Sequence, residues 1–369
     1  MAAIKRHGGL TQVELAGITG LSPATVSNIV RELTAVSVLQ TSPSTRSGRR
    51  ASLVTFSRAT GLAVGVHVSS HHLRIIVADV NRSVLSEKHM PLARDHRADN
   101  ELNRMALLLS DMLVSIGSTL DDVITVGVAV DAPIVHGTGT VASRGLMRGW
   151  IGVDVADAVR ARLKKPVVVD NAASLSALAE TRLGVARDLR NVVYLDVGEH
   201  ISAGFVLNGA LFRGQHGMAG ALGHSIVIPG GPPCWCGRRG CLNAVAGGRA
   251  LLQLMEPAQG ATRVGDIVTK AKANDPLSIR ALSDAGTHIG IAVGNLWNTI
   301  DPEVVVIGGE LAESGELLVS PIRQAMAYVV TSDIVAPTRI EQAGLGFRGA
   351  ALGALLRAIN EADMPNAVN

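Results

Sequence analysis

Aromatic residues are scarce in this chain of 369 residues, which has three Trp, two Tyr and four Phe. The cores must therefore be aliphatic, and no broad aromatic platform for stacking unpaired bases is expected. Uninterrupted apolar runs of about eighteen residues are absent too, which argues against a membrane-spanning helix. Because the first residues also lack the apolar stretch of a signal peptide, we expect a cytoplasmic protein.

Cysteine is nearly absent as well, since the three cysteines, Cys234, Cys236 and Cys241, lie within eight residues. This odd, clustered set is typical of a reducing compartment, where such cysteines bind metal more often than they form disulfides. Together with His224, they supply the four soft ligands of a closed tetrahedral Zn2+ site. No position is left for water, so the zinc is expected to be structural. The alternative is a set of three buried or reduced thiols.

Basic charge is concentrated at the N-terminus. Residues 1–60 carry seven Lys or Arg and two Glu, a net charge of +5, whereas the whole chain carries +3. The remainder therefore carries −2. A short basic module on a mildly acidic body indicates a polyanionic partner for that module, although a solvated basic face would give the same count.

Two helices joined by a tight turn are predicted inside this basic module. Thr11 and Glu14 have the spacing of a capping box, which starts a helix that ends near Gly20. Ser22 as N-cap and Pro23 at the first helical position start the second helix. This pattern is typical of a helix-turn-helix.

The second helix has one apolar stripe and one polar face. The stripe consists of Val26, Ile29, Val30 and Leu33, at helical spacing. We expect the other face to read base edges in a DNA major groove. The residues expected to contact DNA on this helix are Ser22, Ala24, Thr25, Ser27, Asn28 and Arg31.

A wing is predicted directly after these helices. Residues 38–40 and 51–56 read as two short strands, and residues 41–50 read as the polar turn between them. The turn contains Arg46, Arg49 and Arg50, which are suited to binding phosphates or a narrow minor groove. The alternative is a helical hairpin that docks another protein.

Strands alternate with helices from residue 62 onward, as an α/β fold requires. A hairpin, helix, strand scheme occurs twice, which predicts two related lobes. The expected strands are at about residues 62–68, 73–78, 123–130, 167–169, 192–197, 204–207 and 304–307. The expected helices are at about residues 100–116, 154–163, 172–183, 279–299 and 348–360.

Four motifs in this body resemble those of the ROK family (repressors, open reading frames, kinases). They are Val169-Asp-Asn171 with Ala179-Glu180, Gly220-Ala-Leu-Gly-His224, the cysteine cluster, and Asp301-Pro-Glu-Val-Val-Val-Ile-Gly-Gly309. The winged helix-turn-helix ahead of them is similar to that of the repressor branch, which includes the N-acetylglucosamine and xylose repressors. The resemblance covers about residues 10 to 360.

The resemblance implies an α/β fold in which a winged helix-turn-helix precedes a two-lobed, actin-like ATPase fold. The expected domains are a DNA-binding domain at residues 1–58 and a ROK domain at residues 59–369. Lobe one is expected at about residues 59–185 plus the C-terminal helix, and lobe two at about residues 186–345, with the zinc loop at residues 224–241. A homodimer or homotetramer and a sugar-derived effector between the lobes are also implied.

Departures from the family pattern argue against sugar phosphorylation. Where the kinases have Asn-Asp, with the aspartate as base, this chain has Asn171-Ala172, and alanine accepts no proton. The glycine-rich phosphate hairpins are replaced at residues 67–71 and 198–202. Only Gly308-Gly309 survives; it resembles the adenosine-side glycines of the kinases, but a simple strand-to-helix turn is the favoured interpretation.

The expected effector site has changed as well. Asn171 and His224 match residues that bind sugar in relatives, but Ala221 and Asn243 replace two carboxylates. A plain hexose should therefore bind weakly. A different effector, a protein partner or no ligand all remain open, with Asn171, His224 and Asn243 as the candidate effector residues.

The sequence as a whole predicts a transcriptional regulator, most simply a repressor, that binds double-stranded operator DNA through its N-terminal domain and is not an enzyme. The alternatives are a divergent carbohydrate kinase with a DNA-binding domain, and a regulator controlled by a protein partner. Trp150 and Trp235 are expected to pack rather than face a ligand. A second metal at His67, His71, His72 and His200 is not favoured, because no cysteine or carboxylate joins them.

Overall fold

A computed structural model describes residues 1–46, 49–57, 60–93, 95–142, 146–259, 263–331 and 339–362. The side chains of residues 6, 45–46, 49–50 and 256–259 are not described. Contacts divide the chain into two compact units. The first unit is Met1–Val130, Val153–Val169 and Ala351–Asn369, and the second is Asp131–Gly152 and Asp170–Ala350. The domain boundaries predicted from the sequence stay a prediction.

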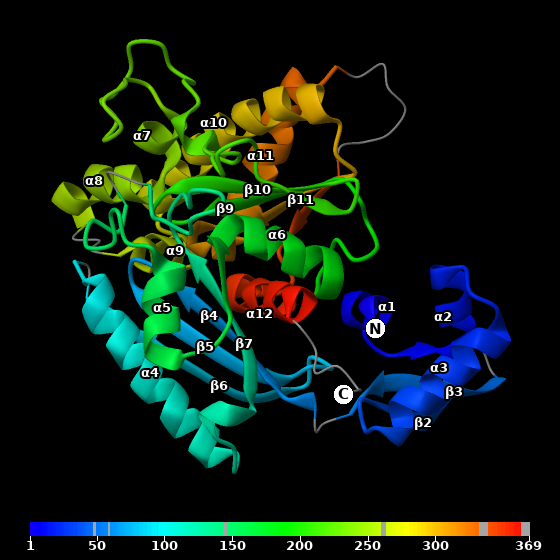
Figure 1. Ribbon diagram of the computed structural model, residues 1–369. Coiled ribbons are helices and arrows are strands. Elements are labelled where there is room, and N and C mark those ends of the chain that lie inside the picture. The colour runs from blue at the N-terminus through cyan, green and yellow to red at the C-terminus, as the bar shows by residue number, and fades with distance from the viewer. Residues whose placement is uncertain are drawn as a thin grey trace. The chain divides into compact units, whose positions relative to one another are not determined.

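The N-terminal part of the first unit, residues 1–57, is a winged helix-turn-helix that we call the head (Figure 1). The capping box of Thr11 and Glu14 is present, and Ser22 accepts a hydrogen bond from the backbone N–H of Thr25. Both helix starts are therefore as the sequence predicts. The head consists of α1 (Ala2–His7), β1 (Leu10–Thr11), α2 (Gln12–Thr19), α3 (Pro23–Ala35), β2 (Leu39–Arg46) and β3 (Arg49–Phe56).

Two details of the head differ from the prediction. Ile29 is 39% exposed, because it lies at the edge of the apolar stripe and only Val26 and Val30 of α3 are buried. The wing is also longer than expected, since β2 and β3 pair from Leu39↔Phe56 to Arg46↔Arg49. The two strands of the hairpin thus extend through most of residues 41–50, which the polar composition indicated as a turn.

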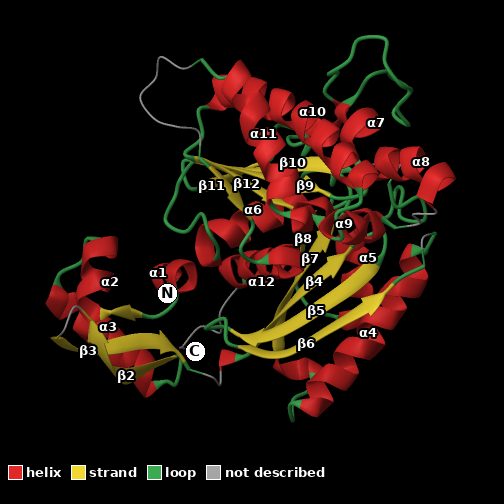
Figure 2. Cartoon of the chain, turned by 180° about the vertical axis from the view of Figure 1, so that it is seen from behind, coloured by secondary structure: helices red, strands yellow, loops and turns green. Residues whose placement is uncertain are grey.

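The body of the first unit is built on a five-stranded sheet with the order β6-β5-β4-β7-β8 (Figure 2). β4 pairs antiparallel with β5 and parallel with β7, while β6 is an exposed edge strand. The strands are β4 (Leu62–Val68), β5 (His72–Asp79), β6 (Val84–Pro91), β7 (Val123–Val130) and β8 (Val167–Asn171). The helices are α4 (Ala98–Ser115), η2 (Leu120–Asp122), α5 (Val155–Leu163) and α12 (Gly349–Glu361).

The second unit contains another five-stranded sheet, in the order β11-β10-β9-β12-β13. β11, β10 and β9 are antiparallel, and β9, β12 and β13 are parallel. Each sheet therefore consists of a three-stranded meander followed by two parallel strands, in the same order, and the predicted internal repeat is confirmed. The strands are β9 (Val192–Val197), β10 (Ile201–Leu207), β11 (Ala210–Phe212), β12 (Val304–Gly308) and β13 (Ile340–Gln342).

Helices cover the second sheet, and their apolar sides form its largest core. The long helix predicted at 279–299 is α10, and it begins at Pro276, behind its N-cap Asp275. The helices are α6 (Ala172–Leu183), η3 (Leu222–His224), α7 (Leu242–Ala246), α8 (Gly248–Gln259), α9 (Val264–Lys272), α10 (Pro276–Ile300), η4 (Glu310–Ser314), α11 (Glu316–Val329) and η5 (Gly346–Arg348).

Helix backbones approach both sheets closely at glycines. A Cβ on Gly65 or Gly127 would lie 2.2 Å or 2.0 Å from a backbone oxygen of α12. In the second unit, a Cβ on Gly204 of β10 would lie 2.2 Å from the carbonyl oxygen of Ala173 in α6. Backbone atoms cannot rotate away, so each contact requires a residue without a side chain.

None of the helices in the described ranges is long and apolar enough to cross a membrane.

We predict that Gly127→Ala lowers the free energy of unfolding by about 1–3 kcal/mol, because the added methyl group forces α12 away from β7. Chemical denaturation followed by circular dichroism measures this loss. Gly17→Ala is the control, since nothing lies within 4 Å of a Cβ there. Equal stability of the Gly127→Ala protein and the wild type would contradict the close approach.

Candidate metal centre and nucleic-acid interface

Four side chains converge in the second unit, and all four were expected to bind zinc. His224 ends the turn η3, while Cys234, Cys236 and Cys241 lie in the loop that leads into α7. One potential ligand atom from each residue lies within 4.8 Å of the others. Nδ1 of His224 is 3.7 Å from Sγ of Cys234, and Sγ of Cys236 is 3.7 Å from Sγ of Cys241.

The two separations of 3.7 Å are close to those of a tetrahedral zinc site. With Zn–S bonds of about 2.3 Å and Zn–N bonds of about 2.0 Å, ligand atoms should lie about 3.8 Å apart for S–S and about 3.5 Å for S–N. Burial raises the pKa of Cys234, and it raises that of Cys241 to about 12. A divalent cation among the sulfurs would favour the thiolates that this burial otherwise disfavours.

The loop around this cluster is attached to the sheet by short contacts. Oδ1 of Asn243 accepts a hydrogen bond of 2.7 Å from the backbone N–H of Ile201, at the start of β10. A Cβ on Gly223 would lie 2.3 Å from Nδ2 of Asn243, and one on Gly220 would lie 1.9 Å from the carbonyl oxygen of Ala203. The segment that carries His224 is therefore held against β10 on both sides of the histidine.

The candidate DNA-reading residues share the exposed side of α3. Those predicted to contact DNA, namely Ser22, Ala24, Thr25, Ser27, Asn28 and Arg31, are all exposed. Arg31 donates a hydrogen bond of 3.0 Å to Oδ1 of Asn28, which links two of these side chains along the helix. The side chains of Arg46, Arg49 and Arg50 lie outside the described part of the chain, although their backbones belong to β2 and β3.

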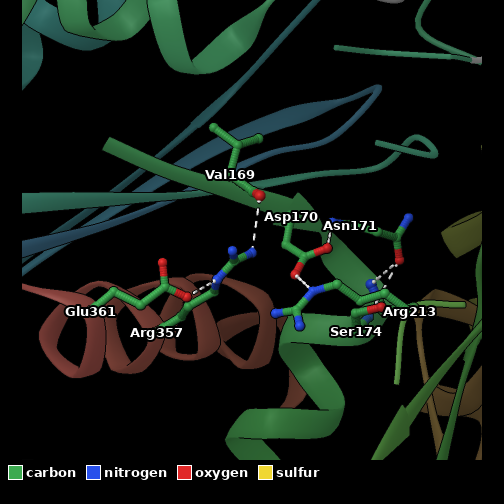
Figure 3. Close-up of polar contacts among 8 residues, drawn as sticks. Val169, Asp170, Asn171, Ser174, Arg213, Arg357 and Glu361 are labelled. Carbon is green, nitrogen blue, oxygen red and sulfur yellow. Dashed lines mark hydrogen bonds and ion pairs between the residues drawn. The ribbon is translucent and has the colours of Figure 1, made fainter. Parts of the chain in front are cut away.

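The predicted effector residue Asn171 is occupied by structural contacts (Figure 3). As the N-cap of α6, its Oδ1 accepts hydrogen bonds from the backbone N–H groups of Ala173 and Ser174. Its Nδ2 donates to the carbonyl oxygen of Ala132 at 3.0 Å. Within the described residues, the structure gives no hydrogen bond from Asn171 to His224 or Asn243. An effector role for these three residues stays a prediction.

An ion pair beside Asn171 was not foreseen from the sequence. Nε of Arg213 lies 2.7 Å from Oδ2 of Asp170, and the other oxygen of Asp170 accepts the backbone N–H of Asn171 (Figure 3). The side chain of Asp170 is 9% exposed. The two partners are 43 positions apart in the chain, and no local pattern connects them.

Ala172 and the pair Gly308-Gly309 lie in packed surroundings. Ala172 is 2% exposed at the start of α6. A Cβ on Gly308 would lie 2.0 Å from the hydroxyl of Tyr194, and one on Gly309 would lie 2.3 Å from Oδ1 of Asp196. Tyr194 is itself 3% exposed, and burial raises its pKa. Side-chain packing alone is thus sufficient to require these two glycines.

The other residues weighed as site candidates pack against their neighbours. Trp150 is fully buried, whereas Trp235 is 36% exposed and makes an edge-to-face contact with His224 at 4.6 Å between ring centroids. Nε2 of His72 is 3.3 Å from Nδ1 of His67, and Nδ1 of His72 is 2.7 Å from the hydroxyl of Ser69. The cluster of His224 and three cysteines is the one group of metal-ligand type found among the described residues.

Taken together, these features define a class of protein in which a winged helix-turn-helix precedes a duplicated α/β body of the actin-like, sugar-kinase type. The chain belongs to the ROK family, which residues 63–361 match. Residues 1–35 match a winged helix-turn-helix DNA-binding family.

Relatives of known name include both regulators and a kinase. The chain is 26% identical over 356 residues to the xylose repressor of Bacillus subtilis (strain 168), covering 95% of this chain and 91% of the repressor. It is 28% identical over 277 residues to a glucokinase of Halalkalibacterium halodurans, covering 71% of this chain and 84% of the kinase. A solved structure of a ROK family transcriptional regulator, a homologue of the Escherichia coli MLC protein, is similar with a TM-score of 0.78 at 21% identity. The matched region covers 95% of this chain and 91% of the regulator's chain.

We predict that Cys236→Ser lowers bound zinc from about one ion per chain to a small fraction, because a closed site that loses one of four ligands binds metal weakly. The melting temperature should fall by about 5 °C or more, since metal binding contributes to stability. Elemental analysis and calorimetry measure the two effects. Arg239→Gln, in the same loop, is the control; full zinc retention with unchanged melting in the Cys236→Ser protein would contradict a zinc site.

Proposed function

We propose that this protein is a DNA-binding transcriptional regulator, most simply a repressor, in which a ROK body controls a winged helix-turn-helix. The observation that carries the proposal is the solvent-exposed polar side of α3, behind the Ser22-Pro23 start of the helix. Residues of this kind on the second helix of a helix-turn-helix reach base edges in the major groove. The net charge of +5 in residues 1–60 supplies the attraction to phosphate.

The body supports regulation rather than sugar phosphorylation. Phosphoryl transfer requires a carboxylate near the attacking hydroxyl, and Ala172 supplies none. Glu199 and His200 now occupy the turn before β10 where the kinases have glycines, and a carboxylate there repels phosphate. The relatives include a kinase as well as repressors, so the choice between a regulator and a kinase rests on these local replacements.

The metal cluster is proposed to hold one structural Zn2+, bound by His224, Cys234, Cys236 and Cys241. Four protein ligands leave no open position, so the ion would brace the loop and activate no water. Since Asn243 and Gly223 attach this loop to β10, zinc would keep His224 fixed beside any effector that binds there. The effector would be a small molecule, sugar-derived or anionic, or else a partner protein, and the protein would act as a homodimer or homotetramer.

We predict that Asn28→Ala weakens binding to a cognate operator by about 5- to 150-fold and relaxes the preference at one base pair, because an amide that pairs with a base edge discriminates by about 1–3 kcal/mol. The operator is first selected from a random DNA library with wild-type protein, and affinities are then measured by fluorescence anisotropy. Asn103→Ala, at another exposed asparagine on a helix, is the matched control and should bind as the wild type does. Equal affinity and preference for both variants would remove Asn28 from the interface, and failure of the wild type to select any sequence would refute the proposed function.

We predict that sugars do not stimulate ADP formation from ATP, because a missing general base alone costs on the order of 100- to 10,000-fold in rate. A coupled ADP assay with a panel of hexoses, pentoses and amino sugars measures this, with a ROK glucokinase as positive control. Sugar-dependent ADP release above the protein-free background would show that another residue replaces the aspartate and would favour the kinase.

A further inference from the structure

The turn between β5 and β6 contacts the head through Asn81, within the first unit. Nδ2 of Asn81 donates a hydrogen bond of 2.8 Å to the carbonyl oxygen of Phe56, and the backbone N–H of Phe56 donates one of 2.9 Å to Oδ1 of Asn81. One side-chain amide therefore pairs with both backbone groups of the last residue of β3. Phe56 is fully buried, so neither of these groups can turn to water instead.

The pairing between Asn81 and Phe56 occurs at a point where no strand of the head lies beside β3 on that side. β1 reaches only Leu53 and Val54 on its side of β3. The next N–H, that of Ser57, points to the other side and donates to the carbonyl oxygen of Val38. Because successive backbone groups of a strand point in opposite directions, those of Phe56 face the side that β1 has left. Asn81 takes the place of the missing strand.

Further contacts restrain the head near the same turn. The guanidinium of Arg82, which follows Asn81, donates to the carbonyl oxygen of Lys5 in α1. The ammonium of Lys5 donates to the carbonyl oxygen of Ala362, just after α12. Arg82 has a φ of +71°, which shapes the turn that presents both side chains, and the carboxylate of Asp79 accepts the N–H of Ser83 within it.

We propose that Asn81 is the positioning residue that fixes the head to the rest of the first unit, so that the body sets the spacing at which two heads read DNA. Without this pairing, the head is joined to the rest of the unit by the contacts of Lys5 and Arg82 and by the five residues between Phe56 and Leu62, which we call the tether. With it, the head moves with the strand pair β4–β5, since Asp79 pairs with Leu62. The inference rests on the proposed function and adds to it the residue that couples the body to DNA.

The first test measures whether the head is held. In hydrogen–deuterium exchange on the full-length protein, Asn81→Ala should speed exchange in peptides that cover β3 and the tether, while peptides from the second unit exchange as in the wild type. Asn103→Ala, which removes an asparagine side chain from α4 of the same unit, should change neither. Asn81→Asp keeps an acceptor for the N–H of Phe56 but replaces the donor with a carboxylate oxygen that faces the carbonyl oxygen of Phe56. It should therefore also speed exchange in these peptides, and it serves as the second variant if Asn81→Ala fails to fold by circular dichroism.

The second test measures spacing. The operator selected by the wild type is synthesised as a single half-site and as two half-sites whose separation varies over half a helical turn, about 5 base pairs. The wild type and Asn103→Ala should prefer one spacing, and Asn81→Ala should lose about tenfold of that preference while binding a single half-site equally well, because a tethered head adapts to several separations.

The possible outcomes distinguish failure of this inference from failure of the proposed function. Equal spacing preference in Asn81→Ala and the wild type, or no preference in the wild type, overturns the inference and leaves DNA binding intact. If the wild type selects no DNA sequence, the proposed function fails, and exchange alone decides whether Asn81 holds the head. If hydrogen–deuterium exchange is unchanged in both Asn81 variants, the inference that Asn81 holds the head is wrong.

Discussion

Close contact between helix backbone and sheet is the constraint on which both units of the body depend. α12 approaches the first sheet at Gly65 and Gly127, and α6 approaches the second at Gly204. At these points a carbonyl oxygen of the helix occupies the place of a side chain on the strand. Because each helix lies this close, small aliphatic side chains are sufficient to fill the space between helix and sheet, and the chain contains very few aromatic residues.

Local signals in the sequence were sufficient for many elements, and distant contacts were not predictable. Caps at Thr11 and Ser22 act within three residues, so they fix helix starts without reference to the rest of the chain. The edge strand β6 was missed because its exposed side chains lack an apolar alternation, and α11 was missed because Pro321 lies inside it. The metal cluster was predictable because its three cysteines are neighbours in sequence. The ion pair of Asp170 with Arg213 was not, because only the folded chain brings the two together.

The body retains the fold of its kinase relatives while its polar groups serve other purposes. Asp170 neutralises Arg213, Asn243 holds the start of β10, and Asn171 caps α6. Gly308 at the end of β12 and Gly309 directly after it leave room for Tyr194 and Asp196. These polar groups are thus engaged by the protein itself, which costs less than leaving buried polar atoms unpaired.

The hydrogen bonds of Asn171 have a consequence for ligand selectivity. Its oxygen already accepts two backbone N–H groups, and one of its two amide hydrogens is given to Ala132. Within the described part of the chain, the structure leaves one amide hydrogen and no strong acceptor on this side chain. A ligand that met this side chain could therefore only accept a hydrogen bond from it, through a carbonyl, carboxylate, phosphate or hydroxyl oxygen. The hydrogens of a sugar hydroxyl would have to find their acceptors elsewhere.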